Sequence, residues 1–313
     1  MRIAIVGAGG VGGYFGTRLA VAGNDVTFVA RGRHLEAIRR DGLEIRSPLG
    51  AFRAPANSAV ASISELGPVD LVIVAVKLWD TDDVAAQLRP AVDRGARVIS
   101  LQNGVHKDMI LRRHLPHEAV LGGACYISAF IQEPGIITHN GTLQKVVFGD
   151  YQQEQTPLAR AFLAACHAAC HAAGIEAEIS SDIERLIWEK FVFLVGLSAT
   201  TTAIRQPIGA VRTHPRSRVL LRDLMAEVVA VGQASGVQLD EKFADDRLAF
   251  CDTLPADMTS SMHNDLEHGN RLELPWLSGG VVELATRMGI SVPRNQAVAD
   301  ILAPYELGVP AMD

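Results

Sequence analysis

Residues 3–12 read Ile3-Ala4-Ile5-Val6-Gly7-Ala8-Gly9-Gly10-Val11-Gly12, an apolar run that passes directly into the pattern G-x-G-x-x-G. The run predicts a buried strand, and a helix is expected to follow it. In such a unit the first glycine allows the tight turn, the second lets the backbone approach a pyrophosphate, and the third lets the helix pack on the strand. The strand before the turn and the helix after it favour a dinucleotide site over a purely structural turn. The predicted cofactor-binding turn consists of Gly7, Ala8, Gly9, Gly10, Val11 and Gly12.

The rest of the first half alternates apolar runs with helical patterns. Runs that are apolar throughout are typical of strands buried on both faces of a parallel sheet. Strands that alternate with helices indicate βαβ units and therefore an α/β fold with a doubly wound sheet. The predicted strands are Ile3–Val6, Val26–Ala30, Leu71–Val76 and Val98–Leu101, and the predicted helices are Val11–Ala22, Arg33–Arg40, Asp82–Leu88 and Lys107–His114.

Residues 120–174 predict a second group of strands and one long helix. The strands are Val120–Phe130, Ile136–His139 and Gln144–Gly149, joined by turns at Glu133-Pro134-Gly135 and Asn140-Gly141. The helix has Thr156 as N-cap and Pro157 as its first residue, and it ends at Gly174. From about Asp182 onward the pattern is helical, so we place a domain boundary near residue 181. The chain is predicted to comprise a Rossmann-type domain over residues 1–181 and an all-helical domain over residues 182–313.

The composition limits the classes of function. The chain has 313 residues, 48% of them hydrophobic and 20% charged, which suffices for two packed domains and excludes a disordered chain. A net charge of −6 without a basic stripe argues against nucleic acid and anionic membranes as partners. The apolar N-terminal run is too short for a secretory signal, and the apolar stretch 191–204 is shorter than a bilayer span. The four cysteines show no CxxC spacing, so a cytoplasmic protein is expected.

The end of the second strand indicates which dinucleotide is bound. NAD sites usually carry Asp or Glu there for the ribose 2′-hydroxyl, but this strand runs into Ala30-Arg31-Gly32-Arg33. Because an arginine suits a 2′-phosphate, we predict NADPH as the cofactor and Arg31 as its phosphate ligand. Alternatively, Arg31 and Arg33 only solvate a loop and the first turn of a helix.

Polar residues also follow the third and fourth strands, at the sheet edge where such folds bind ligands. Lys77 comes directly after Leu71–Val76 and could meet a phosphate. Asn103, within Gln102-Asn103-Gly104, could hydrogen-bond the nicotinamide half, although Asn-Gly at a strand end is also a common turn. Lys77 and Asn103 are therefore candidate cofactor residues.

One lysine interrupts the most apolar predicted helix. Residues 183–204 are apolar nearly all round, as in a buried helix, yet Lys190 lies among them. A lysine there needs a partner, a ligand or a route to water, and such residues often have a function. The alternative is a snorkelling lysine, with a packed stem and a solvated ammonium group.

Several motifs occur in order over nearly the whole chain. They are the GAGGVGGYFG turn, Val29-Ala30-Arg31-Gly32, Val76-Lys77, Gln102-Asn103-Gly104, Trp188-Glu189-Lys190, Thr259-Ser260-Ser261-Met262 and Leu272-Glu273-Leu274. Together they resemble those of the ketopantoate reductase (2-dehydropantoate 2-reductase) family. The resemblance implies an NADP-dependent oxidoreductase of pantothenate biosynthesis, with an N-terminal Rossmann domain, a helical C-terminal domain and an active site in the cleft between them. The implied reaction is the reduction of a 2-keto acid, ketopantoate to pantoate, by NADPH.

The resemblance also implies roles for single residues. Lys190 matches the family's catalytic lysine, whose ammonium can stabilise the charge that develops on the carbonyl oxygen and donate a proton. Ser261 matches a contact to the substrate carboxylate. Glu273, the second catalytic candidate, matches a contact to the substrate's distal hydroxyl. Asn103 matches the residue that links nicotinamide and substrate, and Arg31 matches the 2′-phosphate ligand.

Some positions depart from the family pattern. The best-known members carry asparagines four, eight and eighteen positions after the lysine, where this chain has Leu194, Ser198 and Ile208. Leu194 and Ser198 share a helix face with Lys190, so this wall of the substrate pocket is predicted to be more apolar, with Ser198 kept as a candidate substrate contact. Pro275 stands where an acidic residue is usual. A paralogue that reduces another keto acid and a non-catalytic NADPH-binding sensor are therefore alternatives.

The sequence does not distinguish reduction of a keto acid from oxidation of the corresponding hydroxy acid. The remaining features predict no metal site. Cys166, His167, Cys170 and His171 pair at i, i+4 on neighbouring faces of one helix, so they cannot surround one tetrahedral ion. His263 and His268 are expected on a surface helix without an orienting partner. The apolar C-terminal helices could supply a homodimer interface.

Overall fold

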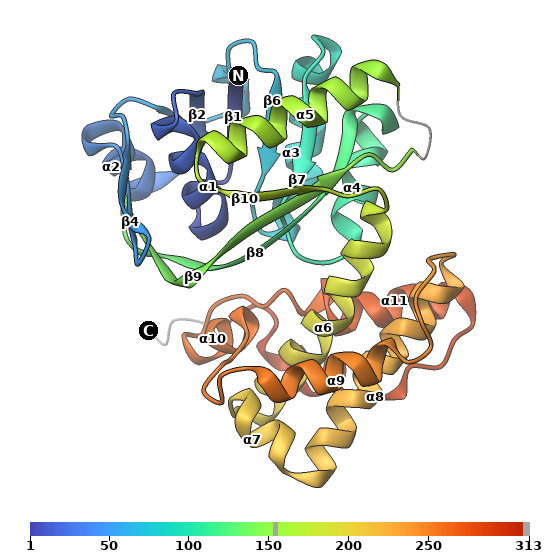
Figure 1. Ribbon diagram of the computed structural model, residues 1–313. Helices are drawn as coiled ribbons and strands as arrows, with labels where there is room; N and C mark the ends of the chain where they lie inside the picture. The colour runs from blue at the N-terminus through green and yellow to red at the C-terminus, as the bar shows by residue number, and fades with distance from the viewer. Residues whose placement is uncertain (153–155, 309–313) are drawn as a thin grey trace. The chain divides into compact units, whose positions relative to one another are not determined.

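The structure is a computed structural model that describes residues 1–152 and 156–308, and it separates into two compact units (Figure 1). The first unit comprises Met1–Asn103 and Lys107–Glu184, and the second comprises Gly104–His106 and the residues from Arg185 onward. Residues 309–313, the end of the predicted second domain, lie outside the described residues. All the described strands belong to the first unit, whereas the second consists of helices and loops. The predicted fold, α/β followed by a mostly helical region, is confirmed.

A 10-stranded sheet forms the centre of the first unit. Its strands are β1 (Arg2–Val6), β2 (Asp25–Val29), β3 (Leu43–Ser47), β4 (Gly50–Ala54), β5 (Ala59–Val60), β6 (Leu71–Val74), β7 (Arg97–Ser100), β8 (Val120–Glu133), β9 (Ile136–Gly149) and β10 (Glu176–Ile179). Their order is β4-β3-β9-β8-β7-β6-β1-β2-β5, with β10 paired to β9. From β5 to β8 all neighbours are parallel, and without the β3–β4 hairpin their chain order is that of a dinucleotide-binding sheet. The order reverses between β1 and β6, which is where such sheets bind ligands.

Helices cover both faces of the parallel strands. They are α1 (Gly10–Val21), α2 (Gly32–Asp41), α3 (Thr81–Asp93), α4 (His106–His114) and α5 (Pro157–Ala172), with short 3-10 turns at Ile63–Glu65, Leu78–Asp80 and His117–Ala119. Ile3 and Ile5 of β1 pack in one core with α1, α2 and α5, while Ala4 and Val6 pack in a second core with α3 and α4. Figure 1 shows α5 lying across one face of the sheet. The strands read as unbroken apolar runs because both of their faces are buried.

The predicted turn at Asn140-Gly141 is wrong, because β9 continues through it as one antiparallel partner of β8. Ser128 pairs with Asn140 but its neighbour Ile127 pairs with Gln144, so residues 141–143 bulge out of the ladder. Gly141 has a φ of 72°, a conformation that glycine adopts without strain. An isolated glycine within a strand pattern can thus mark a bulge rather than a chain reversal. The predicted turn at Glu133-Pro134-Gly135 does join β8 to β9.

The pattern did not predict β3, β4, β5 or β10. β3 and β10 lie along the edge of β9 that β8 leaves open: Ile45 pairs with Ile137, and Glu178 pairs with Val147. β10 is mostly exposed and rich in acidic residues, so it carries no apolar alternation. Lys145 of β9 forms ion pairs with Glu178 and Glu176 at 2.8 and 3.4 Å. These cross-strand ion pairs stabilise the pairing of β10 with β9, which the hydrophobic pattern does not indicate.

The ends of α5 follow the predicted signals. The Oγ1 of Thr156 accepts a hydrogen bond from the backbone N–H of Ala159 at 3.1 Å, as an N-cap does. At the other end the buried Arg18 of α1 donates to the carbonyl of Ala173 from Nε at 3.1 Å and from Nη2 at 2.8 Å. A cation at the negative end of a helix dipole is stabilising, so Arg18 fixes α5 to α1.

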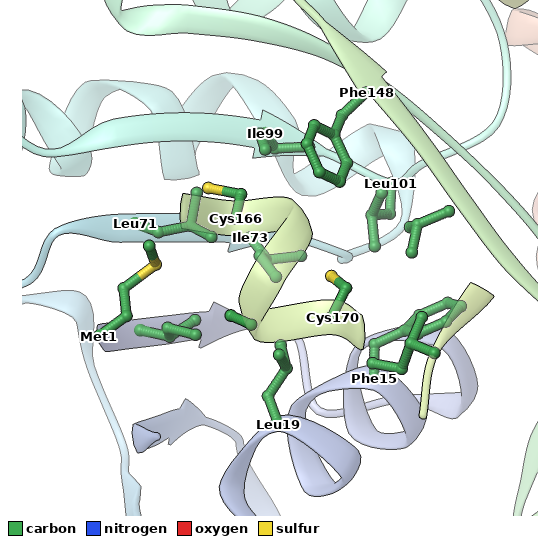
Figure 2. A pocket seen from close by; sticks show the side chains of 14 residues that line it. Met1, Phe15, Leu19, Leu71, Ile73, Ile99, Leu101, Phe148, Cys166 and Cys170 are labelled. Carbon is green, nitrogen blue, oxygen red and sulfur yellow. The ribbon is translucent and has the colours of Figure 1, made fainter. Parts of the chain in front are cut away.

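An apolar pocket of about 30 Å³ lies under α5, between that helix, α1 and the sheet (Figure 2). Cys166 and Cys170 point into it together with side chains such as Phe15, Leu19 and Phe148. Burial raises the pKa of Cys166 to about 12 and that of Cys170 to about 11. A space of this size without polar partners is a gap in the core rather than a site for a polar substrate.

The second unit is built around one long helix. Its helices are α6 (Ile183–Ile204), α7 (Ile208–Thr213), α8 (Pro215–Ala234), α9 (Phe243–Thr253), α10 (Ser261–Glu267), α11 (Ser278–Met288) and α12 (Pro293–Leu302), with 3-10 turns at Leu274–Trp276 and Ala303–Tyr305. A Cβ at Gly196 of α6 would lie 2.5 Å from Met225, and one at Gly232 of α8 would lie 2.9 Å from Trp188. These two glycines let α6 and α8 pack closely in opposite directions.

Among the described residues α6 is the one helix long and apolar enough, with a mean hydropathy of 1.3, to cross a membrane. Of its most apolar window, 67% is buried within the protein. The core helix of a globular domain has the same composition, so length and hydropathy carry little weight here.

Candidate functional site

The glycine turn between β1 and α1 has the geometry that its sequence predicts. Gly7 has a φ of 101°, and a Cβ there would lie 2.7 Å from the backbone of Ala75 and Val76, just after β6. A Cβ on Gly12 would overlap the carbonyl of Gly7, so this glycine lets α1 start tightly against the turn. Both positions therefore exclude a side chain for reasons within the fold itself.

Gly9 differs from the other glycines of the turn because no atom of residues 1–152 or 156–308 lies within 4 Å of the position that its Cβ would occupy. It is the N-cap of α1, no side chain caps the helix, and the first turn holds no acidic residue. The first N–H groups of a helix and the positive end of its dipole attract anions, phosphate above all. The glycine turn thus presents open space beside unneutralised backbone donors, which suits a pyrophosphate.

The parallel strands bring the other predicted cofactor residues to the same edge of the sheet. Arg31 follows β2, Lys77 follows β6 and Asn103 follows β7. β2 and β6 pair with β1 from opposite sides, β7 pairs with β6, and all these pairs are parallel. Arg31 is exposed, and no carboxylate stands at the end of β2. The ammonium group of Lys77 lies 5.7 Å from the ring centre of Trp79. This edge can therefore hold a dinucleotide that carries an extra phosphate near β2.

Gln102, for which no separate role was predicted, connects two of these strand ends. Its side chain is buried, and its Nε2 donates to the carbonyl of Val76 at 2.8 Å and to Oγ1 of Thr81 at 2.7 Å. Its Oε1 accepts from Oγ of Ser100 at 2.9 Å. The amide of Gln102 thus joins the end of β7 to the segment between β6 and α3, in which Lys77 lies. No pattern in the sequence indicated this role, because the partners of Gln102 lie on other elements.

In the second unit Lys190 lies on α6 and is half-buried. The neighbouring Glu189 accepts a hydrogen bond from Nε of Arg185 at 2.8 Å, one helical turn earlier. Phe191 is buried and meets the ring of Trp188 edge to face at 5.8 Å between centroids. The ammonium group of Lys190 is therefore carried by a helix that packing holds in place.

The start of α10, which carries Ser261, is tied to the last turn of α6. Ser260 is buried, and its Oγ caps α10 by accepting from the N–H of His263 at 3.1 Å and lies 3.1 Å from Oγ1 of Thr201. Ser261 itself is exposed. These contacts leave the hydroxyl of Ser261 available at the positive end of a helix.

His263 is not the surface residue that the sequence predicts. Its side chain is buried, and its Nδ1 donates to the carbonyl of Thr201 at 2.8 Å. Its Nε2 lies 3.1 Å from the carboxylate of Glu267, one turn further along α10. The expectation failed because one partner comes from α6 and the other lies one turn further on the same face of α10. His263 fixes α10 on α6, which is a structural role.

Two family models match the chain: Ketopantoate reductase PanE/ApbA over residues 3–153, and Ketopantoate reductase PanE/ApbA C terminal over residues 182–306. The chain belongs to the ketopantoate reductase family. As a member of it, the protein is an oxidoreductase that acts on CH–OH donors.

Single relatives of the ketopantoate reductase family resemble the chain along its whole length. A 2-dehydropantoate 2-reductase of Halobacterium salinarum is 33% identical over 96% of this chain and 98% of its own. The uncharacterized oxidoreductase YkpB of Bacillus subtilis is 32% identical over 98% of this chain and 99% of its own. The crystal structure of a 2-dehydropantoate 2-reductase from Geobacter metallireducens has a TM-score of 0.88 at 31% identity, covering 97% of this chain and 99% of that one.

The positions that depart from the ketopantoate reductase pattern are apolar or enclosed. Leu194 is half-buried on the same face of α6 as Lys190, while Ser198 and Ile208 are fully buried. Within the part of the chain that the structure describes, the hydroxyl oxygen of Ser198 has no hydrogen-bond partner. A buried hydroxyl without a partner costs free energy, so this part of α6 is not optimised for stability.

Glu273 precedes the 3-10 turn Leu274–Trp276 and is half-buried. Pro275, a departure from the family pattern, occupies one of the first positions of that turn, where its fixed φ is favourable. The proline thus has a local structural reason. Among the described residues no group of three or more His, Cys, Asp or Glu side chains could hold a metal ion.

Proposed function

We propose that the protein uses NADPH to reduce a 2-keto acid, and that this substrate is ketopantoate (2-dehydropantoate), which gives pantoate for pantothenate biosynthesis. The observation that carries the proposal is the open face of Gly9 at the uncapped start of α1, with Arg31 at the end of β2. In a ketopantoate reductase fold these two features match a dinucleotide phosphate and a ribose 2′-phosphate.

The residues present fit NADPH. The backbone of Gly7, Ala8, Gly9, Gly10, Val11 and Gly12 would hold the pyrophosphate, Arg31 the 2′-phosphate, and Lys77 and Asn103 the remainder. When bound, the cofactor supplies a hydride for the carbonyl carbon of the substrate. We assign residues 1–181 to cofactor binding and residues 182–313 to substrate binding and to a homodimer interface.

Lys190 is the proposed general acid. Its Nζ would stabilise the negative charge that develops on the carbonyl oxygen and would give that oxygen its proton. Half-burial in an apolar helix strengthens this electrostatic contribution, because water screens the charge less. Ser261 and Ser198 would contact the carboxylate side of the substrate region, Glu273 its distal hydroxyl, and Asn103 would join cofactor and substrate.

Replacing Lys190 tests its assigned role. Lys190→Ala should lower kcat by a factor on the order of 100 to 10,000, while the dissociation constant for NADPH stays near that of the wild type. The matched control is Lys242→Ala, which removes an exposed lysine and should leave turnover unchanged. Stopped-flow kinetics and fluorescence titration give the two quantities. Normal turnover in Lys190→Ala would exclude it as the general acid.

A second candidate is the reduction of a less hydroxylated 2-keto acid. The apolar Leu194 beside Lys190 and the enclosed Ile208 favour it, since neither can hydrogen-bond a hydroxyl group. Leu194→Asn should then raise kcat/KM for ketopantoate and lower it for a keto acid with an apolar side chain. If Leu194→Asn impairs both substrates equally, the residue does not set the specificity.

The remaining alternative is a sensor that binds NADPH without turnover, which would leave Lys190 without a role. We further propose a cytoplasmic protein whose partners are a small keto acid and a second copy of itself, rather than nucleic acid or a membrane. The net charge of −6 supports this assignment.

A further inference from the structure

His34, in the first turn of α2, connects the glycine turn to the β8–β9 hairpin. Its Nε2 lies 2.8 Å from the carbonyl oxygen of Ala8, and its Nδ1 accepts a hydrogen bond from the N–H of Gly135 at 3.0 Å. His34 is half-buried, so these bonds are shielded from much of the solvent. The imidazole thus spans two segments that are more than a hundred residues apart in the chain.

These partners fix the protonation state of the ring. Because Nδ1 accepts from Gly135, it carries no proton, and the neutral ring must hold its proton on Nε2. The carbonyl of Ala8 can only accept, so Nε2 donates to it. Burial lowers the pKa of His34 below 6.5, which favours this neutral form at pH 7.

The bond to Ala8 determines where the next N–H points. The carbonyl of Ala8 and the N–H of Gly9 belong to one planar peptide group, and in a trans peptide they point in opposite directions. Holding the carbonyl on His34 therefore turns the N–H of Gly9 away from the imidazole. The space beside Gly9 is open, as a ligand on its backbone would require.

The hairpin end of this connection is anchored independently. The carbonyl of Gly135 accepts from the N–H of Glu44 at 2.9 Å, so β3 holds the same peptide segment that donates to His34. On the other side of the turn, a Cβ on Gly10 would overlap the carbonyl of Ala129 in β8. The β8–β9 hairpin thus braces the glycine turn from two sides, and His34 is the side chain in that brace.

We propose that His34 is a positioning residue of the cofactor site: it holds the Ala8–Gly9 peptide so that the N–H of Gly9 faces the pyrophosphate. The proposal rests on the proposed function, because it takes the glycine turn to bind a dinucleotide. His34 touches neither the substrate nor the reacting atoms. Its effect is on cofactor affinity and not on the proton transfer at Lys190.

Two substitutions separate positioning from simple bracing. His34→Gln places an amide donor near the position of Nε2, so it can keep the bond to Ala8 and lose the one to Gly135. His34→Asn places an amide oxygen near Nδ1, so it can keep the bond to Gly135 and lose the one to Ala8. Positioning predicts that His34→Asn binds NADP⁺ roughly fivefold more weakly than wild type, while His34→Gln stays close to it. Bracing of the hairpin predicts the opposite order.

A pH profile gives a second, independent readout. Protonated Nδ1 would be a donor facing the N–H donor of Gly135, so this hydrogen bond would be lost. Only the neutral ring can therefore keep both bonds. Since its pKa is lowered, the positioning is complete at pH 7 and is lost as the pH falls through that lowered value. The charged groups on the surrounding elements are Arg31, Arg33 and Glu36 of α2, Glu133 of β8, and Glu44 of β3, which is paired with Arg46 and Arg53. The first four are exposed, so solvent screens them.

The experiment is calorimetric titration of NADP⁺ into wild type, His34→Gln and His34→Asn between about pH 5 and 8. The 2′-phosphate of NADP⁺ titrates in the same range. Because His34→Gln has no titrating ring at position 34, its pH profile gives the contribution of the phosphate without that of His34. Weaker binding by His34→Asn, together with a steeper loss at low pH in wild type than in His34→Gln, supports the proposal. Equal affinity of His34→Asn and wild type overturns it, as does stronger binding by His34→Asn than by His34→Gln.

Failure of the proposed function looks different in the same titration. If wild type binds no NADP⁺ at pH 7, the cofactor assignment is wrong and the role of His34 falls with it. If wild type binds but the variants do not differ, only the role of His34 is wrong. Should His34→Asn not fold, His34→Gln decides alone: a pH profile identical to that of wild type contradicts the proposal.

Discussion

Arg31 and the absence of a carboxylate at the end of β2 set the expected cofactor preference. The guanidinium is exposed directly after the strand, so it can reach a 2′-phosphate without losing an existing partner in the core. A charge-assisted bidentate contact to phosphate is worth more than a neutral hydrogen bond.

Arg31→Ala should therefore weaken NADPH binding by roughly tenfold or more and leave NADH binding almost unchanged. Arg33→Ala, one residue into α2 and also exposed, is the comparison that shows which arginine binds the phosphate. Fluorescence titration with both cofactors measures the change. If Arg31→Ala weakens the binding of NADPH and NADH equally, Arg31 does not bind the 2′-phosphate.

The cysteines should be unreactive in the native protein. All four are buried, and burial raises the pKa of Cys166 to about 12 and those of Cys170 and Cys251 to about 11. Because the thiolate is the reactive form, its fraction stays very small until the pH approaches these values. Titration with a chromogenic disulfide at about pH 8 should detect almost no thiol in native protein and all of them after denaturation. Rapid labelling of the native form would contradict the burial of the thiols.

Single side chains with partners far away in sequence were the hardest to predict. Lys190 and Arg31 stand out in the sequence because each contradicts its local pattern. Gln102, His34 and His263 look ordinary in the sequence, because their roles depend on hydrogen bonds to backbone groups of other elements. No periodicity reports such contacts, and only the folded arrangement supplies them.

At the scale of elements, Gly9 and Gly10 form a matched pair. A Cβ at Gly9 meets nothing, whereas a Cβ at Gly10 overlaps the carbonyl of Ala129 in β8. Gly9→Ala should fold with a free energy of unfolding within about 1 kcal/mol of wild type but lose most of its affinity for NADPH.

Gly10→Ala should instead lower the free energy of unfolding by roughly 1–3 kcal/mol, because the backbone of β8 must move. Chemical denaturation and cofactor titration of both variants separate the two effects. Unimpaired NADPH binding by Gly9→Ala would mean that the cofactor does not approach this peptide.

The strands were predictable from the sequence where both of their faces are buried. The strands β1, β2, β6 and β7 are apolar on both faces, and the glycine turn fixes where α1 begins. β3, β4 and β10 were not predictable, because they are only partly buried and therefore carry no continuous apolar run. The turn at Asn140-Gly141 failed for a related reason: glycine permits a positive φ, but whether the chain then reverses or bulges depends on the partner strand.

At the scale of the whole molecule, the residues proposed for the cofactor and those proposed for the substrate fall into different compact units. The dinucleotide features all lie in the first unit, and Lys190, Ser261 and Glu273 all lie in the second. Family membership follows from motifs that span both, so it could be anticipated from the sequence and is confirmed by the comparisons. The substrate could not be anticipated, since Leu194 and Ile208 replace asparagines of the family pattern without indicating which keto acid is bound.

The most direct test follows NADPH oxidation by the wild-type protein with ketopantoate and with a panel of 2-keto acids that differ in size and hydroxylation. We expect turnover of ketopantoate, faster with NADPH than with NADH. Turnover of a less hydroxylated keto acid instead would keep the chemistry and make Leu194 the first specificity residue to change. Tight NADPH binding without turnover of any 2-keto acid would contradict the proposed reductase.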